Sequence, residues 1–407
     1  MKKSALQKYA QLIVRSGINV QKGQEVVIKA DLDQPEFIEM LARECYLAGA
    51  AKVTVDWSYL PITKLHVDYR SEEVLGKVEK WEEEKLRHNV QTVPCVIRIE
   101  SEDPDGLKGI DQKKYMSAQQ KRQNISKPYT DELEGKYQWC IAGVPGKKWA
   151  KKVFPELSPA KAMERLWEAI LSVSRVDDDP IAAWRRHNED LQSHCDHLNT
   201  LGITELIYRS SNGTDLTVGL IPQAQFCGGG ETSLGGVYFN PNIPTEECFT
   251  SPMRGKAEGI VYSTMPLSYQ GQLIEDFSVR FEGGRAVEVR AAKNQSLLEQ
   301  MISADEGASY LGECALVPYD SPIRNSGILF YNTLYDENAS CHLALGRGYI
   351  DTIKDYEKYT LEQMRAMGIN DSMIHVDFMI GSEDLSIKGR RGDGSLVDIF
   401  TGGGWAF

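Results

Sequence analysis

A short segment near the end of the chain places a histidine two residues before an aspartate. The run His375-Val376-Asp377-Phe378 alternates polar and apolar side chains, which predicts a strand with His375 and Asp377 on one face. An imidazole and a carboxylate on one face could form half of a metal site. A hydrogen-bonded strand histidine beside a surface aspartate fits the same pattern, so this segment alone does not decide between them.

A second segment, residues 339–349 (ASCHLALGRGY), surrounds His342 with small and apolar residues. His342 could therefore be a ligand or a buried core histidine. Gly346 and Gly348 predict a loop, which could bring Tyr349 back toward His342. The Tyr349 hydroxyl could donate to a developing oxyanion, or its ring could simply pack.

Three acidic side chains stand in unusual contexts. Glu246 and Glu247 follow the turn-rich sequence NIPT, and adjacent like charges require compensation of at least one. Glu313 opens the strand-like run CALV, where a buried carboxylate costs free energy unless it is paired or binds a cation. Each acid alone could be a solvated loop residue, and spacing does not choose between Glu246 and Glu247.

Taken together, these segments indicate a metal centre. Residues 201–407 contain two of the seven histidines, and both lie in the segments described. Two histidines and three carboxylates are sufficient for two divalent cations with one or more shared ligands. His194 and His197 also flank a cysteine and an aspartate, but they lie in a charged helical pattern that we interpret as a solvated helix face.

The elements that must position these residues change in character along the chain. The first part alternates helical and strand-like runs, which predicts parallel βαβ units, whereas the part after residue 201 contains short β runs separated by glycine-rich turns. We therefore predict an α/β N-terminal domain (1–190) and an α+β, mainly antiparallel, catalytic domain (191–407). The expected strands are 25–30, 52–57, 93–99, 205–209, 215–219, 259–263, 276–282 and 286–290, and the expected helices are 5–16, 35–48, 160–173 and 181–198.

Charge and cysteine content narrow the class of protein. Residues 1–200 carry 31 basic and 31 acidic side chains and residues 201–407 carry 15 and 27, so the net charge of −12 belongs to the second part. Such an acidic half disfavours nucleic-acid binding. The chain lacks an apolar run long enough to span a membrane, and its eight scattered cysteines fit reduced, mostly buried thiols. We expect a cytoplasmic protein that binds neither nucleic acid nor membrane.

Several long segments of this sequence resemble the aminopeptidase T family, the thermophilic-type dinuclear metallo-aminopeptidases. The resemblance covers essentially the whole chain and includes an N-terminal pattern from Leu6 to Trp57. Cys248, where valine is more usual, and residues 349–360 depart from the family pattern, and the second departure bears on substrate preference. The matching segments are 228–231 (GGGE), 242–252 (NIPTEECFTSP), 266–271 (PLSYQG), 310–318 (YLGECALVP), 320–331 (DSPIRNSGILFY), 332–348 (NTLYDENASCHLALGRG), 375–381 (HVDFMIG) and 405–407 (WAF).

The resemblance implies a cytosolic, homodimeric exopeptidase that acts on peptides with a free N-terminus and uses two divalent ions (zinc, cobalt or manganese). It selects Glu247 over Glu246. The ligands it implies are Glu247, Glu313, His342, His375 and Asp377, with Tyr349 also at the metal centre.

The expected reaction is hydrolysis of the N-terminal peptide bond by a water that bridges the two cations. Tyr349 would stabilise the oxyanion or act as a ligand, and Glu247 or Glu313 would carry the proton to the leaving amine. Two other classes remain open at this point. A glycosidase with Glu247 and Glu313 as its acid pair would stay active in a chelator, and a metal-binding scaffold would release no amino acids.

Overall fold

The computed structural model describes residues 2–101 and 103–407, and its internal contacts divide the chain into two compact units. The first unit comprises the chain as far as Arg186 together with residues 230–244 and 270–272. The second unit comprises residues 187–229, 245–269 and 273–407. The two domains predicted to meet at residues 190 and 191 stay a prediction.

The first unit is built on a five-stranded sheet with the strand order β10-β4-β3-β1-β2. Every neighbouring pair in this sheet is parallel, which confirms the predicted βαβ organisation. The buried positions of β1 and β3 are mostly β-branched or small, including Val26, Ile28 and Ile97, whereas Lys29 and Arg98 are exposed. The strands are β1 (Glu25–Asp31), β2 (Lys52–Ser58), β3 (Cys95–Glu100), β4 (Trp139–Gly143) and β10 (Asn242–Ile243).

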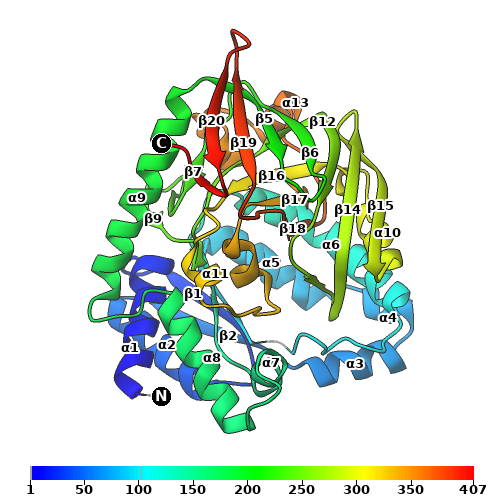
Figure 1. Cartoon of the computed structure of the whole chain (residues 1–407). Helices are drawn as coiled ribbons and strands as arrows, with labels where there is room; N and C mark the ends of the chain where they lie inside the picture. The colour runs from blue at the N-terminus through cyan, green and yellow to red at the C-terminus, as the bar shows by residue number, and fades with distance from the viewer. Residues whose placement is uncertain (1, 102) are drawn as a thin grey trace. The chain divides into compact units, whose positions relative to one another are not determined.

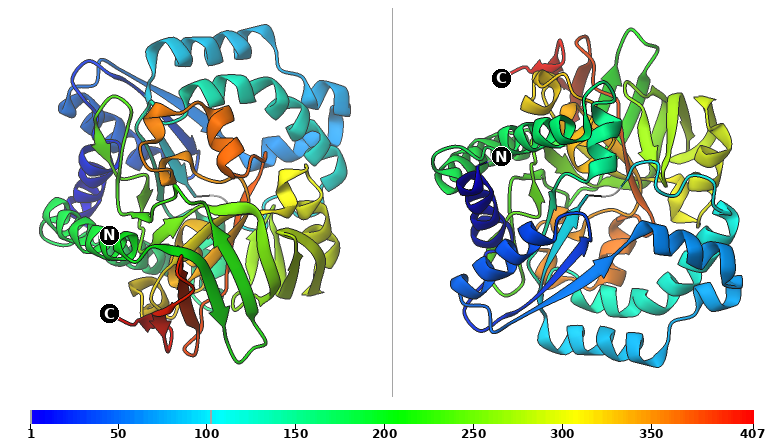
Figure 2. Two further views of the ribbon diagram at one scale, coloured as in Figure 1. Left: turned by 90° about the horizontal axis from the view of Figure 1, so that it is seen from above. Right: turned by 90° about the horizontal axis from the view of Figure 1, so that it is seen from below.

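Helices of this unit pack through aromatic side chains. Tyr9, Phe37 and Trp167 form one cluster with ring centroids 5.6–6.4 Å apart, which joins α1, α2 and α8 (Figure 1). Farther along the chain, α5 and α6 lie side by side (Figure 2). The helices are α1 (Lys3–Leu12, continued by a π-helical turn, Ile13–Gly17), α2 (Pro35–Ala48), α3 (Leu60–Tyr69), α4 (Glu72–Gly76), α5 (Lys80–Thr92), α6 (Gln112–Leu133), α7 (Lys147–Val153) and α8 (Pro159–Val173).

Helix α9 (Pro180–Thr200) contains the change from the first unit to the second, between residues 186 and 187. A short hairpin of β8 (Glu231–Thr232) and β9 (Tyr238–Phe239) lies in the segment that returns to the first unit. No helix among the described residues is long and apolar enough to cross a bilayer. All eight cysteines are free, and seven of them are buried.

The second unit contains two antiparallel sheets, as predicted. The larger sheet has nine strands in the order β13-β14-β12-β6-β5-β19-β20-β21, with β15 added to β14, and Figure 1 shows β5, β19 and β20 side by side. Its strands are β5 (Ile203–Arg209), β6 (Asp215–Leu220), β12 (Pro252–Tyr262), β13 (Leu267–Tyr269), β14 (Gln272–Glu282), β15 (Arg285–Lys293), β19 (Ser386–Arg391), β20 (Leu396–Thr401) and β21 (Gly404–Trp405).

The smaller sheet carries the predicted site residues. Its strand order is β18-β17-β16-β11-β7, and its strands are β7 (Cys227–Gly228), β11 (Cys248–Thr250), β16 (Leu311–Leu316), β17 (His342–Gly346) and β18 (His375–Met379). Four short helices accompany the two sheets: α10 (Gln295–Ile302), α11 (Pro322–Asn325), α12 (Thr333–Asp336) and α13 (Leu361–Met367). Helix α13 begins with a capping box in which Thr360 and Gln363 satisfy each other's backbone amides.

Candidate metal centre

The register of the smaller sheet brings the predicted ligands onto one face. Glu313 pairs with Ala344 on β17, and Ala344 pairs in turn with Asp377 on β18. Residues directly opposite in an antiparallel sheet point to the same side. His342 lies two residues before Ala344, and His375 lies two residues before Asp377, so both imidazoles share this face. The small side chain of Ala344 leaves space between Glu313 and Asp377.

The opposite face of these strands is the hydrophobic core of the unit. Alternation places Val376 and Phe378 there, as predicted, together with Leu343 and Leu345 of β17. Cys248 of β11 belongs to the same core. The core fixes the register of the strands, because a slip of one residue would expose these apolar side chains and bury the ligands in the core.

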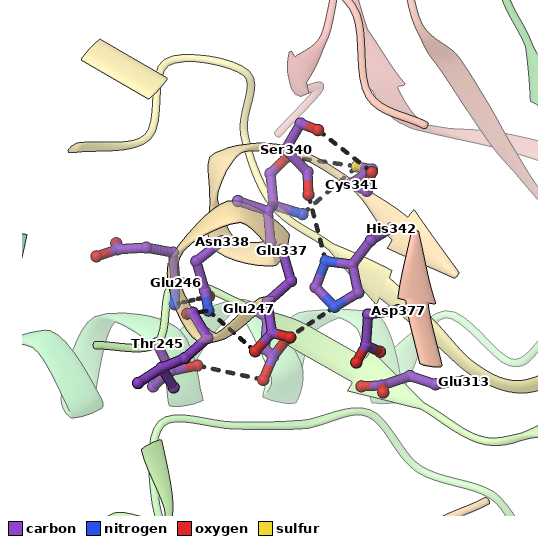
Figure 3. A network of polar contacts seen from close by, with 12 residues as sticks. Thr245, Glu246, Glu247, Glu313, Glu337, Asn338, Ser340, Cys341, His342 and Asp377 are labelled. Carbon is purple, nitrogen blue, oxygen red and sulfur yellow. Dashed lines mark hydrogen bonds and ion pairs between the residues drawn. The ribbon is translucent and has the colours of Figure 1, made fainter. Parts of the chain in front are cut away.

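Glu247 enters this face from the residue that immediately precedes β11. It lies two residues before Phe249, which pairs with Ala315 on the site face. Figure 3 shows that the neighbouring Glu246 side chain points away from this group, although both glutamates are buried. The backbone direction thus separates two acids that spacing could not distinguish.

Two glycines make the arrangement sterically possible. A β-bulge in β16 follows Gly312, where a Cβ atom would lie 2.2 Å from the carbonyl oxygen of Arg347. Bulges redirect the next side chain, which here is Glu313. Gly346 ends β17 at φ +106°, where a Cβ atom would lie 2.1 Å from the carbonyl oxygen of Ile374. This turn carries the chain from β17 to Tyr349.

Two groups of metal-type ligands occur among the described residues, and Glu313 belongs to both. One group is Glu247, Glu313 and His342, and the other is Glu313, His375 and Asp377, with ligand atoms within 4.8 Å of one another in each group. Nε2 of His342 lies 3.1 Å from Oε2 of Glu247. Nε2 of His375 lies 3.1 Å from both Oε2 of Glu313 and Oδ1 of Asp377. The two groups are adjacent and have the carboxylate of Glu313 in common.

The remaining nitrogen of each imidazole is oriented by a backbone carbonyl. Nδ1 of His375 lies 2.7 Å from the carbonyl oxygen of Arg347, and Nδ1 of His342 lies 3.3 Å from that of Ser340. A proton on each Nδ1 directs both Nε2 atoms into the site, as in protein metal centres whose histidines are held by an outer hydrogen bond. On Glu247, Oε1 accepts a hydrogen bond from the hydroxyl of Thr245 at 3.3 Å (Figure 3).

Burial and neighbouring charges shift the pKa values of Glu313, Asp377 and both imidazoles from their ordinary values. Burial raises the pKa of Glu313 to about 7. Burial opposes protonation of His342, but the hydrogen bond and the charge of Glu247 outweigh it and raise the pKa of that imidazole to about 9. Burial also opposes protonation of His375, but the charges and hydrogen bonds of Asp377 and Glu313 together outweigh it and raise the pKa of that imidazole. Burial would raise the pKa of Asp377, but the charges of His375 and His342 outweigh burial and lower it. Without a cation, protons balance the buried negative charge.

Sequence reasoning missed a fourth acid, Glu337. Glu337 is buried and lies in a one-turn 3₁₀ helix, Glu337–Ala339. Burial and the charges of Asp377, Glu247 and Glu313 raise its pKa well above the ordinary value. The signal available in the sequence was an acidic pair, Asp336-Glu337, five residues before His342. Asp336 serves a different purpose, since its carboxylate accepts the backbone amides of Phe330 and Asn332.

The loop after β17 brings Tyr349 to the edge of the site. The Tyr349 hydroxyl lies 3.4 Å from Nε2 of His375, and their ring centroids are 4.9 Å apart. The hydroxyl of Ser251 accepts the Tyr349 amide at 2.8 Å, and Phe249 packs edge-on against the Tyr349 ring. Burial and the nearby carboxylates, Glu313 first among them, raise the pKa of Tyr349, so it is a neutral donor.

One buried carboxylate oxygen of the site depends on a positive partner. Oδ1 of Asp377 is buried and has no hydrogen-bond partner among residues 2–101 and 103–407, although Nε2 of His375 lies 3.1 Å away. A buried carboxylate oxygen without a hydrogen bond is costly unless a cation satisfies it. The donors are carboxylates and imidazoles without thiolates, a set that suits zinc, cobalt or manganese.

The two helix histidines set aside by sequence reasoning lie outside the ligand groups. His194 stacks on Trp405 with ring centroids 4.7 Å apart, and His197 contacts Phe407 at 4.1 Å. His197 nevertheless stays exposed and His194 is only partly buried, so this helix face remains in contact with solvent as predicted. His187, a third histidine of α9, lies 2.7 Å from the carbonyl oxygen of Thr245 through Nε2.

Comparison with known proteins gives matches over almost the whole chain. The family model described as thermophilic metalloprotease (M29) matches residues 2–405. The chain is 41% identical to "Aminopeptidase AmpS" of Bacillus subtilis over 99% of this chain and 98% of that protein. It is 38% identical to "Aminopeptidase T" of Thermus thermophilus over 99% and 98%. The solved structure of AmpT from Thermus thermophilus matches with a TM-score of 0.89 at 37% identity, covering 100% of both chains.

Proposed function

Since the chain belongs to the thermophilic metalloprotease (M29) family and is a metallo-aminopeptidase, we propose that it holds two divalent cations that share Glu313. Glu247 and His342 complete one set of ligands, and His375 and Asp377 complete the other. The observation that carries this proposal is the membership of Glu313 in both ligand groups, supported by the unpartnered Oδ1 of Asp377.

The charges of the site support two cations rather than one. Four carboxylates, those of Glu247, Glu313, Glu337 and Asp377, are buried. Two divalent ions would balance four negative charges when both imidazoles are neutral. A single divalent ion would leave two buried negative charges, which the site could hold only by retaining protons.

The cations held by these residues would supply Lewis acidity and would lower the pKa of a bound water toward neutrality. The protein's own groups then act around the scissile bond. The neutral Tyr349 hydroxyl donates a hydrogen bond to the carbonyl oxygen of the substrate as negative charge develops on it. Because both oxygens of Glu313 would be engaged as the shared ligand, a carboxylate oxygen of Glu247 takes a proton from the attacking water and passes it to the leaving amine as the peptide C–N bond breaks. Arg347 and Ser340 keep the imidazoles neutral at Nε2 through their carbonyl oxygens.

The substrates we propose are peptides with a free N-terminus. An α-amino group is a cation when protonated and a metal ligand when neutral, and a site rich in carboxylates accommodates both forms. Homodimer formation and a cytoplasmic location stay predictions.

The test is a panel of aminoacyl p-nitroanilides, each also in an N-acetylated form, with and without a chelator. We expect hydrolysis only of the compounds with a free amine, loss of this activity in chelator, and recovery when a divalent metal is restored. Activity that survives complete metal removal, or equal cleavage of the acetylated compounds, would refute the proposal. Metal binding without turnover of any free-amine compound would support a binding scaffold instead.

A further inference from the structure

A buried amide connects the two parts of the chain that carry Glu247 and Glu337. Asn338 is fully buried in the turn just before β17. Its Oδ1 accepts the backbone amide of Glu246 at 2.7 Å, a contact between residues 92 positions apart. Its Nδ2 donates to the carbonyl oxygen of Leu334 at 3.0 Å and lies 3.4 Å from Oε1 of Glu337 (Figure 3).

The segment that carries Glu247 is held from the other side by α9, since Nε2 of His187 lies 2.7 Å from the Thr245 carbonyl oxygen and 3.8 Å from Oε2 of Glu246. Ladder pairing in β11 begins at Cys248, one residue after Glu247. The Glu246 amide would be a buried donor without Asn338, and an orphaned buried donor costs about 1–3 kcal/mol. Asn338 thus holds the backbone from which Glu247 projects, while Thr245 holds its carboxylate.

The same side chain touches Glu337 directly. Oε1 of Glu337 receives the Asn338 amide, which directs the other carboxylate oxygen elsewhere. Glu337 faces Asp377, Glu247 and Glu313. The Asn338 side chain therefore positions Glu247 through the backbone of the preceding residue and Glu337 through its carboxylate.

We propose that Asn338 is a positioning residue that sets the distance between Glu247 and Glu337 and thereby the affinity of the site for its cations. This inference rests on the metal-binding function proposed above. This role requires a side-chain amide, because its oxygen accepts the backbone N–H of Glu246 while its nitrogen donates to Leu334 and Glu337. Aspartate has the same shape but lacks the donor and would place a negative charge against Glu337.

Asn338→Asp tests this inference, with Asn199→Asp as its matched control. Asn199 also uses both amide atoms on the backbone, accepting from the Phe226 amide at 2.7 Å and donating to the Phe226 carbonyl at 3.0 Å, but it contacts no member of the ligand groups through these bonds. Each chelator-stripped protein is titrated with Co²⁺ against a chromophoric chelator, and the visible absorption of bound Co²⁺ and the unfolding temperature are recorded.

We expect Asn338→Asp to bind Co²⁺ about 10- to 100-fold more weakly, with altered absorption, as for other residues that hold metal ligands in place. Asn199→Asp should lower the unfolding temperature at most and leave Co²⁺ affinity unchanged. Wild-type affinity in Asn338→Asp would overturn the inference, whatever its unfolding temperature. Should Asn338→Asp fail to fold, the smaller Asn338→Ser replaces it, with the same expected and contradicting results. Failure of the wild-type protein itself to bind Co²⁺ would instead defeat the proposed function.

Discussion

Oε2 of Glu313 lies 3.1 Å from Nε2 of His375, yet Glu313 also belongs to the group that contains His342. The bulge after Gly312 turns this side chain into the space between β16 and β18, on the face where Ala344 is small. A carboxylate has two oxygens, so one residue in this position can serve two cations at once. The predictions below follow from this shared position.

Glu313→Gln should impair both cation sites together. The amide removes the shared negative charge, so the metal content should fall below that of the wild type. The activation free energy should rise by about 4 kcal/mol, which lowers kcat/KM roughly 10³-fold. Metal analysis by mass spectrometry and anilide kinetics measure the two effects. The exposed Glu299→Gln on α10 is the control. Full activity, or full metal content, in Glu313→Gln would remove it from the centre.

Glu247→Gln and Glu246→Gln form a pair that tests the direction of the chain before β11. Both glutamates are buried, but the Glu247 carboxylate lies beside His342, whereas Glu246 points away from the ligand groups. Glu247→Gln loses a ligand, so its metal affinity should fall on the order of 100-fold or more. This loss is larger than that expected when a residue that only holds a ligand in place is replaced. Glu246→Gln should retain wild-type affinity. The reverse ranking in a chelator competition would show that the resemblance selected the wrong acid.

Tyr349→Phe removes one hydroxyl while retaining the ring that packs against Phe249. If the hydroxyl donates to the developing oxyanion, kcat should fall about 10²- to 10³-fold, with little change in KM or metal content. Tyr262→Phe, a half-buried tyrosine in β12, is the control. An unchanged kcat would assign Tyr349 to packing alone, and a parallel loss of metal would make it a ligand.

Metal binding should release protons at neutral pH. In the metal-free protein His342 has a pKa of about 9, so it is protonated at neutral pH, and a cation requires the neutral imidazole. Apparent affinity should therefore rise with pH and level off above about pH 9, by up to about tenfold per pH unit for each proton displaced. Calorimetric titration in buffers of different ionisation enthalpy counts the protons. Binding without proton release, or with affinity that falls as pH rises, would contradict the assigned protonation states.

Much of the fold was predictable because its signals are local. Alternation at residues 375–378 predicted both the strand and the common side of His375 and Asp377, and the change from helical to β texture near residue 201 predicted the two classes of sheet. The return of residues 230–244 to the first unit could not be predicted. It depends on β10, which has two residues and pairs with β4 about a hundred positions away.

The sequence predicted the kinds of ligand in the site but not every acidic residue that lies there. Glu337 lies in a 3₁₀ turn without periodicity, and its proximity to Asp377 arises only from tertiary packing. The turn at Gly346 is visible in the sequence, but the contact between Tyr349 and His375 depends on the direction of the loop, which is not. The choice of Glu247 came from family resemblance, because the two adjacent acids differ only in the side of the backbone from which they project.

The measurement that tests the central claim most directly is a parallel titration of metal content and activity. The chelator-stripped chain is titrated with Zn²⁺ or Co²⁺, and bound metal and hydrolysis of a free-amine anilide are followed in the same samples. If two cations share Glu313, the wild type should bind two equivalents of metal per chain and reach full activity only as the second equivalent binds. Glu313→Gln should neither bind two equivalents nor reach full activity. Full activity at one equivalent, or two tightly bound equivalents in Glu313→Gln, would contradict a dinuclear centre that shares this carboxylate.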